Sequence, residues 1–331
     1  MPEPTRHNYL TTRRDFLVLG TGIFVALSVP LSMRRRLAMS RRSVPLMGTI
    51  AEVQVAHADE RFAQHAIDRA IAELMRVERL MTRFRTDSDI GRANLGAGQE
   101  AVAISPETAK VIEAALRWAS VSEGRFDPAI GSASELWDVL NRHEPPPQGR
   151  VLRLASRGLW RKVDVGQFRG APAVRYEDAD VRLDLGAIAK GYGIDRAVAT
   201  LRDLGVAHAI VTVGGDLFTV GEAPGGGPWQ VGIRSPHDRN ALAATLEVSE
   251  RAVATSGDYE RFFRWHGHTY HHLIDPETGA PRITPMHSAT VLGADCMNTD
   301  AAATAGFGLP RDRAEAIVRR IIDRAEVIPL A

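Results

Sequence analysis

The sequence predicts an α+β fold, a single domain in which mixed and antiparallel sheets are flanked by helices. Helical patterns dominate up to residue 140, whereas short strands separated by Gly, Pro and Asp dominate after residue 173. The late strands follow one another too closely for helical crossovers, which favours antiparallel pairing. No internal repeat interrupts this pattern, and the domain is predicted to span residues 43–331.

Composition limits the classes of partner and the chemistry. The chain has 331 residues, a formal net charge of +1 and 44% hydrophobic residues. These values are ordinary for a globular protein and argue against nucleic acid as its main partner. Cys296 is the only cysteine in the sequence, which excludes an intrachain disulfide and a cysteine-based metal site.

Residues 1–42 are predicted to be a targeting segment that precedes the folded domain. The pair Arg13-Arg14 comes before the uncharged run Phe16–Met33, which is typical of a twin-arginine export signal. That run is just within the length that spans a bilayer, roughly 17–25 residues, so a membrane anchor is the alternative. We therefore expect export to the periplasm by the twin-arginine route. Cleavage of the signal and retention at the inner membrane both stay open.

The first half of the domain is predicted to be mainly helical. Alternation in Ile50–Val55 indicates a strand, and the apolar spacing of Asp59–Met81 indicates a long helix. Ser105 followed by Pro106 is typical of a helix start, which predicts a second helix over Pro106–Val121. The other early segments are predicted as a loop over Phe84–Ile90 leading into a short helix, a turn-rich loop over Gly124–Gly131, a helix over Glu135–Leu140 and a proline-rich loop over His143–Gly149.

Asp184 and Lys190 lie in the segment around which we expect the rest of the chain to be organised. Val181–Leu183 is predicted as a strand and Ile188–Leu204 as the helix that follows it. In one interpretation, the carboxylate and the lysine form a buried ion pair that holds the turn between them. In the other, this turn and the glycine turn Gly214–Asp216 form a nucleotide cradle, in which backbone N–H groups approach phosphates.

The part after residue 173 is predicted to supply most of the strands. They are expected at Val174–Tyr176, Ala209–Val213, Leu217–Val220, Trp229–Ile233, Ala243–Val248, Val253–Ser256, Phe262–Trp265, Thr269–Leu273 and Ala289–Leu292. Two helices, Asp300–Phe307 and Arg311–Ile322, are expected before a final strand at Val327–Leu330.

Two adjacent histidines, His271 and His272, lie in the predicted strand Thr269–Leu273. Neighbouring side chains on a strand face opposite ways, so a two-histidine metal clamp is not expected. One of the two is then a lone base and the other lies at the surface, unless the histidine is structural, as single strand histidines often are. Asp275 follows in an Asp-Pro turn that closes at Gly279.

Asp300 and Thr304 are spaced to share one face of a helix made mainly of small residues. A carboxylate and a hydroxyl with only Ala and Gly around them leave room for a hard cation with oxygen ligands. The alternative is an Asp300 that caps the helix N-terminus and a Thr304 that is simply buried. Spacing alone favours neither interpretation.

Several motifs occur in a fixed order along the chain. They are Met47-Gly48-Thr49, Asp87-x-Asp89-Ile90, Phe126-Asp127-Pro128, Asp184–Gly191, Gly214-Gly215-Asp216, Ala254–Tyr259, His272-x-x-Asp275-Pro276-x-x-Gly279 and Asp300-x-x-x-Thr304-Ala305. Each motif is weak by itself, but the ordered set resembles the ApbE family, the FAD:protein FMN transferases. The resemblance runs from about Met47 to Gly308, nearly the whole domain.

The resemblance implies an enzyme that uses FAD as its substrate together with a divalent ion, usually Mg²⁺. Such an enzyme moves the FMN half of FAD onto a threonine or serine of an acceptor flavoprotein and releases AMP. By position, it implies a metal held by the Ala187 main-chain carbonyl, Asp300 and Thr304, with His272 as the base. It implies flavin and phosphate contacts from Met47, Phe84, Phe126, Asp127, Asp184, Lys190 and the backbone near Ile274.

These implied roles agree with the chemistry of phosphoryl transfer. A dication and Lys190 would neutralise the charge that develops on the leaving AMP. A threonine hydroxyl is weakly nucleophilic, and a base such as His272 contributes roughly 10²–10⁴-fold. Asp275 either orients that imidazole or caps its own turn.

Two other functions stay open at this point. An FAD pyrophosphatase would release AMP without an acceptor, and a non-catalytic FAD-binding protein would leave FAD intact in the presence of Mg²⁺. The resemblance implies that the acceptor is a subunit or regulator of a membrane redox complex. It does not identify that protein.

Overall fold

A seven-stranded antiparallel sheet lies at the centre of the fold, in the strand order β18-β17-β12-β9-β8-β4-β3. The computed structural model describes residues 16–18, 23–26, 37–238 and 240–331. The strands of this sheet are β3 (Ala38–Leu46), β4 (Thr49–His57), β8 (Ala209–Val213), β9 (Asp216–Val220), β12 (Ala252–Gly257), β17 (Ser288–Gly293) and β18 (Glu326–Leu330). Several of them follow directly in sequence, which requires only short turns.

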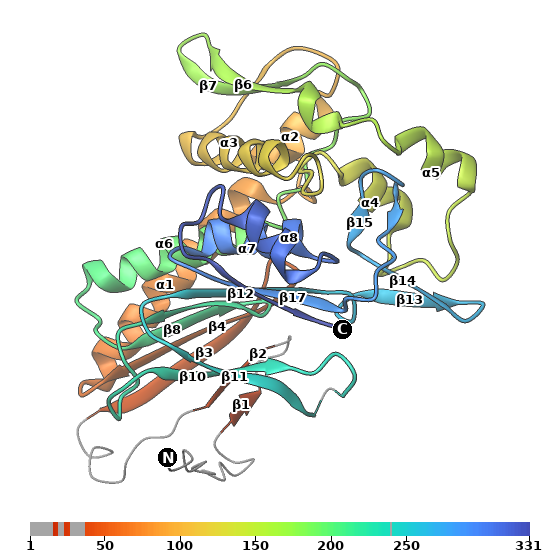
Figure 1. The fold of residues 1–331 in the computed structure, drawn as a ribbon. Helices are drawn as coiled ribbons and strands as arrows, with labels where there is room; N and C mark the ends of the chain where they lie inside the picture. Colours follow the sequence, from red (N-terminus) through yellow and green to blue (C-terminus); the bar gives the residue numbers. More distant parts are fainter. Residues whose placement is uncertain (1–15, 19–22, 27–36, 239) are drawn as a thin grey trace.

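Both faces of the central sheet are covered. Helices α1 (Glu60–Met81), α6 (Ala189–Asp203) and α7 (Cys296–Gly306) lie on one face (Figure 1). A second sheet, in the order β1-β2-β10-β11, lies on the other face (Figure 1). Its strands are β1 (Phe16–Val18), β2 (Ile23–Ala26), β10 (Trp229–Arg234) and β11 (Leu242–Val248).

Strand β8 shows why the central strands have continuous apolar runs. Its residue Val211 packs in a core with helices α1 and α6, whereas Ile210 packs with Trp229 of the second sheet. Successive side chains of a strand point to opposite faces, so a sheet covered on both sides buries every residue. All of β8 is accordingly buried.

A further layer lies on the far side of α6 and α7 (Figure 1). It contains α2 (Asp89–Leu95), α3 (Pro106–Val121) and the three-stranded sheet of β5 (Val102–Ala103), β7 (Ala171–Tyr176) and β6 (Val163–Phe168). Trp118 of α3 is fully buried and donates a hydrogen bond from Nε1 to Asn298 Oδ1 of α7, at 3.0 Å. The alanines of α7 are buried in the same core, and their small side chains allow α3 to pack closely on α7.

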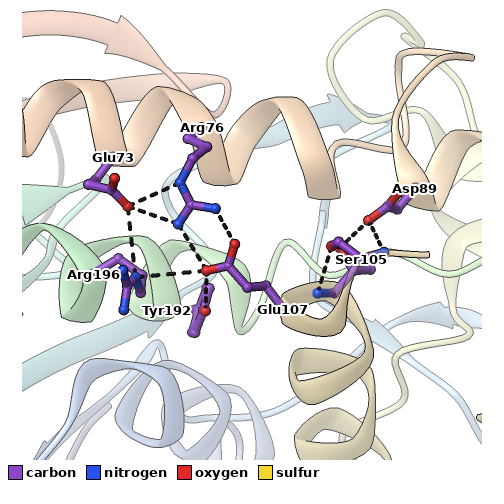
Figure 2. Close-up of polar contacts among 8 residues, drawn as sticks. Glu73, Arg76, Asp89, Ser105, Glu107, Tyr192 and Arg196 are labelled. Carbon is purple, nitrogen blue, oxygen red and sulfur yellow. Dashed lines mark hydrogen bonds and ion pairs between the residues drawn. The ribbon is translucent and has the colours of Figure 1, made fainter. Parts of the chain in front are cut away.

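An interhelical cluster of five polar residues joins α1, α3 and α6 (Figure 2). Glu107 of α3 accepts hydrogen bonds from Arg76 of α1, at 2.9 Å for Nη2, and from the Tyr192 hydroxyl of α6, at 2.8 Å. Glu73 of α1 pairs with Arg76 at 2.8 Å, and Arg196 of α6 lies 3.8 Å from both glutamates. The cluster therefore fixes α6 against the two neighbouring helices.

The remaining elements include two small hairpins. These are β13 (Phe262–Trp265) with β14 (His268–His271), and β15 (Ile274–Asp275) with β16 (Ala280–Pro281). The remaining helices are α4 (Gly131–Trp137), α5 (Gln148–Leu154), the 3₁₀ helix Leu159–Lys162 and α8 (Arg311–Val318). Trp137 of α4 stacks on Tyr270 of β14, with ring centroids 5.5 Å apart, and so attaches the hairpin to the domain.

The predicted α+β class and the antiparallel pairing are confirmed. The predicted long helix is present as Glu60–Met81 with Asp59 as its cap, and the second spans Pro106–Val121 with Ser105 as its predicted cap. Val181–Leu183 is wrong as a strand, because only Arg182 forms an isolated bridge, to Ile130.

Several other elements differ from the prediction. Helix α4 begins earlier than expected and ends at Trp137, because Asp138 adopts a left-handed conformation. Helix α7 begins at Cys296, with Asp295 as its cap, and α8 ends at Val318. The proline-rich loop contributes the start of α5, and β6 was not predicted.

Most of the predicted targeting segment lies outside the described residues. Strand β3 starts at Ala38 and pairs with β4 along its whole length, so residues 38–42 belong to the central sheet. No helix in the described part of the chain is long and apolar enough to cross a membrane. Export and membrane retention remain predictions.

Candidate active site

Lys190, in the first turn of α6, joins three segments that are distant in sequence. Its Nζ lies 2.8 Å from both carboxylate oxygens of Asp300 on α7 and 2.9 Å from Asp216 Oδ2 at the start of β9. It also donates to the Gly186 carbonyl at 3.0 Å. The turn that carries Ala187 is therefore held beside the helix that carries Asp300, as the predicted metal site requires.

The close contact between α6 and α7 depends on a glycine. A Cβ at Gly191 would lie 2.1 Å from the Cys296 carbonyl oxygen, so a larger residue would separate the helices. The Gly191 N–H donates to Asp300 Oδ2 at 3.2 Å. Asp195, one turn further along α6, accepts from the N–H groups of Cys296 and Met297 at 2.7 and 2.9 Å. These bonds fix the start of α7 and hence the position of Asp300.

The other end of α7 is held by two arginines. Arg282 and Arg125 donate to the Phe307 carbonyl at 2.8 and 3.0 Å. Cations at a helix C-terminus interact favourably with the helix dipole, as the carboxylates of Asp195 and Asp295 do at the N-terminus. The helix that carries Asp300 and Thr304 is thus restrained at both ends.

With both carboxyl groups ionised, the cluster of Lys190, Asp216 and Asp300 carries an excess of negative charge. Burial and the charge of Asp300 raise the pKa of Asp216 to about 7, although Lys190 opposes this shift. Burial lowers the pKa of Lys190, but the two carboxylates outweigh it and raise the pKa above its ordinary value. Asp216 Oδ2 is buried and has no hydrogen bond of acceptable geometry. A second cation beside Lys190 would relieve this imbalance.

The oxygen atoms around Asp300 fit a hard divalent cation. Thr304 lies on the same face of α7, and its Oγ1 is 3.1 Å from Ser256 Oγ of β12. Mg²⁺ and Ca²⁺ prefer carboxylate, hydroxyl and carbonyl oxygens of this kind. No three His, Cys, Asp or Glu side chains in the described ranges gather into a metal-holding group. An ion here would therefore need hydroxyl and main-chain ligands such as Thr304 and Ala187.

His272 follows directly after β14 and is held in its neutral form. Burial lowers its pKa to about 3, and the positive charges of Arg261 and Lys190 act in the same direction. Its N–H donates to the Arg261 carbonyl at 3.1 Å, and its Nδ1 lies 3.4 Å from the same oxygen. A neutral imidazole has a nitrogen that can accept a proton, which a general base requires.

The turn between β3 and β4 connects the histidine segment to α6. Arg261 Nη2 donates to the Gly48 carbonyl at 2.8 Å. The Met47 N–H donates to Glu78 Oε1 at 2.6 Å, and the Met47 side chain packs against α6 at Gly193. Met47 has a positive φ of 52°, so this turn holds the residue in a conformation that is uncommon outside glycine. The predicted flavin contact at Met47 thus lies next to the α6 segment that carries Lys190.

Asp184 lies on the other side of the Gly186 turn in the hydrogen-bond network: it accepts from the Gly186 N–H at 2.9 Å, whereas Lys190 donates to the Gly186 carbonyl. Asp184 Oδ2 is 3.0 Å from Arg83 Nε, and the Asp184 N–H donates to the Pro128 carbonyl at 2.8 Å. Phe84 is exposed, with Arg83 above its ring at 4.3 Å. The predicted residues Asp184, Phe84 and Asp127 are therefore brought together through Arg83 and the loop before Pro128.

Two of the predicted flavin-binding residues have side chains that face the interior. Phe126 is fully buried in the core formed with α3 and α7. Ile274 is buried and pairs with Pro281. Asp127 lines a small pocket with Leu154, Leu159 and Pro276 among its walls, and burial raises its pKa to about 7. The side chains of Phe126 and Ile274 are therefore part of the protein interior.

The structure decides several interpretations that the sequence left open. The Asp184–Lys190 ion pair is not formed, because Asp184 pairs with Arg83 and Lys190 with Asp216 and Asp300. Asp300 does not cap α7; Asp295 does. Three further interpretations are decided in the same way. Asp275 accepts from the Glu277 N–H and so caps its turn. Gly214–Gly215 is the two-residue turn of the β8–β9 hairpin, and His271 is buried rather than at the surface.

Sequence reasoning missed four residues of the site. Asp216 was noted only as part of a glycine turn, although a carboxylate that opens a buried strand signals a paired or liganded charge. Ser256 lay in a motif whose hydroxyls had no assigned partner. Arg83 and Arg261 had no signal at all, because their contacts to Asp184 and Gly48 join segments far apart in sequence.

The fold is shared with solved structures of ApbE proteins. The crystal structure of the ApbE protein from Thermotoga maritima superposes with a TM-score of 0.78 and 26% sequence identity, covering 88% of this chain and 94% of that one. The flavin transferase ApbE from Vibrio cholerae superposes with a TM-score of 0.75 and 27% identity, covering 88% and 93%.

Sequence comparison agrees with the structural one. The FAD:protein FMN transferase of Treponema pallidum (strain Nichols) is 32% identical over 312 residues, 89% of this chain and 86% of that protein. That of Klebsiella pneumoniae (strain 342) is 32% identical over 279 residues, 84% and 85% of the two chains. The ApbE family pattern matches residues 47–328, and the chain therefore belongs to the ApbE family.

Proposed function

We propose that this chain is a Mg²⁺-dependent FAD:protein FMN transferase that joins FMN to a threonine or serine hydroxyl of an acceptor protein. The observation that carries the proposal is the buried cluster in which Lys190 faces the carboxyl groups of Asp216 and Asp300, within electrostatic range of a neutral His272. Relatives that share about a third of its residues are FAD:protein FMN transferases.

In the proposed reaction, the acceptor hydroxyl oxygen attacks the phosphorus of the FMN half of FAD. The bond from that phosphorus to the bridging oxygen breaks, and AMP leaves with the bond's electron pair. His272 takes the hydroxyl proton as the new P–O bond forms. The anionic pyrophosphate would itself raise the pKa of the imidazole, since a nearby negative charge favours the protonated form.

Lys190 and a divalent ion would share the task of neutralising charge on the leaving group. Asp300, Thr304 and the Ala187 carbonyl are the residues that would hold Mg²⁺, which supplies Lewis-acid stabilisation of phosphate oxygens. Lys190 reaches the same place from the first turn of α6. Phe84, Asp127 and Asp184 would contact the flavin side of the substrate. Met47 would contact the side of the substrate that lies next to α6.

The test is a transfer assay with the purified protein, FAD, Mg²⁺ and several purified FMN-binding domains. We expect the mass of one acceptor to increase by that of an FMN group, with AMP formed in equal amount. The matched controls omit the acceptor or replace Mg²⁺ with a chelator. AMP formed without any acceptor, and with no acceptor modified, would make the protein an FAD pyrophosphatase instead.

The location of the reaction is part of the proposal. The twin-arginine pattern in residues 1–42 supports export of the folded protein to the periplasm, where a subunit or regulator of a membrane redox complex would be the acceptor. Replacement of Arg13 and Arg14 by lysine should keep the protein in the cytoplasm. Cell fractionation measures this, and unchanged export would remove the twin-arginine route.

A further inference from the structure

The hairpin of β13 and β14 extends from the body of the protein (Figure 1). It forms a sheet of its own, and all residues from Arg264 to Thr269 are exposed. Its base is well anchored, because the Tyr270 ring stacks on Phe263 at 5.2 Å and on Trp137 at 5.5 Å. The exposed tip is therefore a rigid extension of the domain.

Both strands of the hairpin lead directly to the candidate active site. Arg261, the residue before β13, donates to the Gly48 carbonyl, and His272 is the residue after β14. The His272 N–H donates to the Arg261 carbonyl at 3.1 Å, which continues the ladder of the hairpin to the proposed base. An extended peptide bound along the hairpin would therefore lead toward His272.

The register of the hairpin shows which backbone groups face outward. His266 and Gly267 have positive φ values of 46° and 80°, so they form a two-residue hairpin turn that closes on Trp265 and His268. Hydrogen-bonded and non-hydrogen-bonded pairs alternate in an antiparallel ladder. The pairs Arg264–Thr269 and Phe262–His271 are therefore non-hydrogen-bonded, and their N–H and C=O groups point to the two outer edges.

The two edges differ in what covers them. Beside β14, Arg282 lies against the base of the hairpin: its N–H donates to the carbonyl of Leu273, just beyond the strand, and its carbonyl contacts the His271 side chain at Nε2. Beside β13, no strand other than β14 pairs with Phe262 or Arg264 among the described residues. Uncovered strand edges are templates for an added strand.

We propose that the edge of β13 binds an extended segment of the acceptor protein as a third strand and so delivers its threonine or serine to His272. This inference rests on the proposed function. The segment is expected to be acidic, because the hairpin and its base present Arg261, Arg264, His266 and His268, whereas residues 261–271 contain no acidic side chain. Main-chain hydrogen bonds would supply affinity and the charges would supply selectivity.

Proline substitutions can test the two edges separately. Arg264→Pro removes the outward N–H of β13 but none of the bonds within the hairpin, as proline is tolerated where the N–H faces away from the ladder. Arg264→Ala removes the same side chain and keeps the N–H. Thr269→Pro makes the equivalent change on the β14 edge. The probe is the acceptor domain that the wild-type protein modifies in the transfer assay.

We expect Arg264→Pro to raise the KM for the acceptor about 3- to 10-fold above that of Arg264→Ala, with kcat unchanged. The affinity for FAD and the thermal midpoint should match wild type in all three variants, and Thr269→Pro should keep the wild-type KM. Hydrogen exchange at the amides of Phe262 and Arg264 should slow when the acceptor is added.

The outcomes separate this inference from the proposed function. If the wild-type protein modifies no acceptor, the proposed function is wrong. If it does, but Arg264→Pro matches Arg264→Ala and neither amide gains protection, the docking edge is wrong while the transferase function stands. A KM increase confined to Thr269→Pro would likewise overturn the assignment of the β13 edge.

Discussion

Helix α6 takes part in two polar clusters of similar composition and opposite electrostatic character. Lys190 lies with Asp216 and Asp300 in the site, whereas Arg196 and Tyr192 lie with Glu73, Arg76 and Glu107 in the interhelical cluster (Figure 2). In the interhelical cluster two arginines balance two glutamates. In the site one lysine faces two carboxylates, so the charges do not cancel.

The pKa values of Glu107 and Asp216 are shifted in opposite directions. A hydrogen bond from Arg76, with a further one from Tyr192, lowers the pKa of Glu107 to about 2. Burial and a neighbouring carboxylate raise the pKa of Asp216 to about 7. Perturbed carboxylates occur both in structural ion-pair networks and in functional sites. Glu107 is stabilised in its charged form by its partners, whereas Asp216, on balance, is not.

The strongest test of this distinction is His272→Ala. His272 is the proposed base, and the one side-chain hydrogen-bonding contact of its ring within the described part of the chain is a long one, at 3.4 Å to the Arg261 carbonyl, so its loss should affect catalysis far more than folding. We expect kcat for FMN transfer to fall about 10²–10⁴-fold while FAD binding persists. Transfer kinetics and FAD titration measure the two effects, and unchanged turnover would remove His272 from the mechanism.

Replacement of Asp300 tests the unbalanced charge directly. Asp300→Asn keeps the shape of the side chain but removes the carboxylate that faces Lys190 and Thr304. We expect Mg²⁺ binding and transfer to fall together, by roughly 10²–10³-fold, because this charge both holds the ion and shapes the site. Calorimetric titration of Mg²⁺ alongside the transfer assay checks this. A variant with full Mg²⁺-dependent transfer would refute the metal assignment.

A smaller effect is expected from Ser256→Ala. The Ser256 hydroxyl touches Thr304 Oγ1, and without it the threonine can rotate away from Asp300. Loss of a hydrogen bond that orients a metal ligand costs about tenfold or more in metal affinity. The apparent Mg²⁺ constant should rise about tenfold with kcat at saturating Mg²⁺ little changed. An unchanged Mg²⁺ constant would mean that Thr304 needs no such support.

The contrast between local and long-range contacts explains how much of the molecule the sequence could predict. The fold class and the long helices were predictable because apolar spacing and caps such as Asp59 and Ser105 are local signals. The segments that form the site were also predictable as motifs. The partner of each charge was not, since Lys190 reaches Asp300 and Asp216 rather than the nearby Asp184. Such pairings depend on tertiary packing, which here relies on the absence of a side chain at Gly191.

The smallest effect on activity is expected in the interhelical cluster. Glu107→Gln leaves the two arginines without their shared carboxylate, and Glu107 makes no hydrogen bond or ion pair with Lys190, Asp216 or Asp300 among the described residues. We expect transfer to stay within about twofold of wild type, and stability at neutral pH to fall by about 1–2 kcal/mol, because the ion pairs are partly solvated. Denaturant unfolding at several pH values measures this.

The pH dependence of that loss follows from the lowered pKa of Glu107. A carboxylate with a folded pKa of about 2 and an ordinary value of 4.5 stabilises the fold fully above pH 4.5. This contribution disappears as the pH falls toward 2, where wild type and Glu107→Gln should become equally stable. A loss of transfer in Glu107→Gln as large as that in Asp300→Asn would contradict the purely structural role assigned to the interhelical cluster. In that case charge balance would not separate the two clusters, and position along α6 would be the better guide to function.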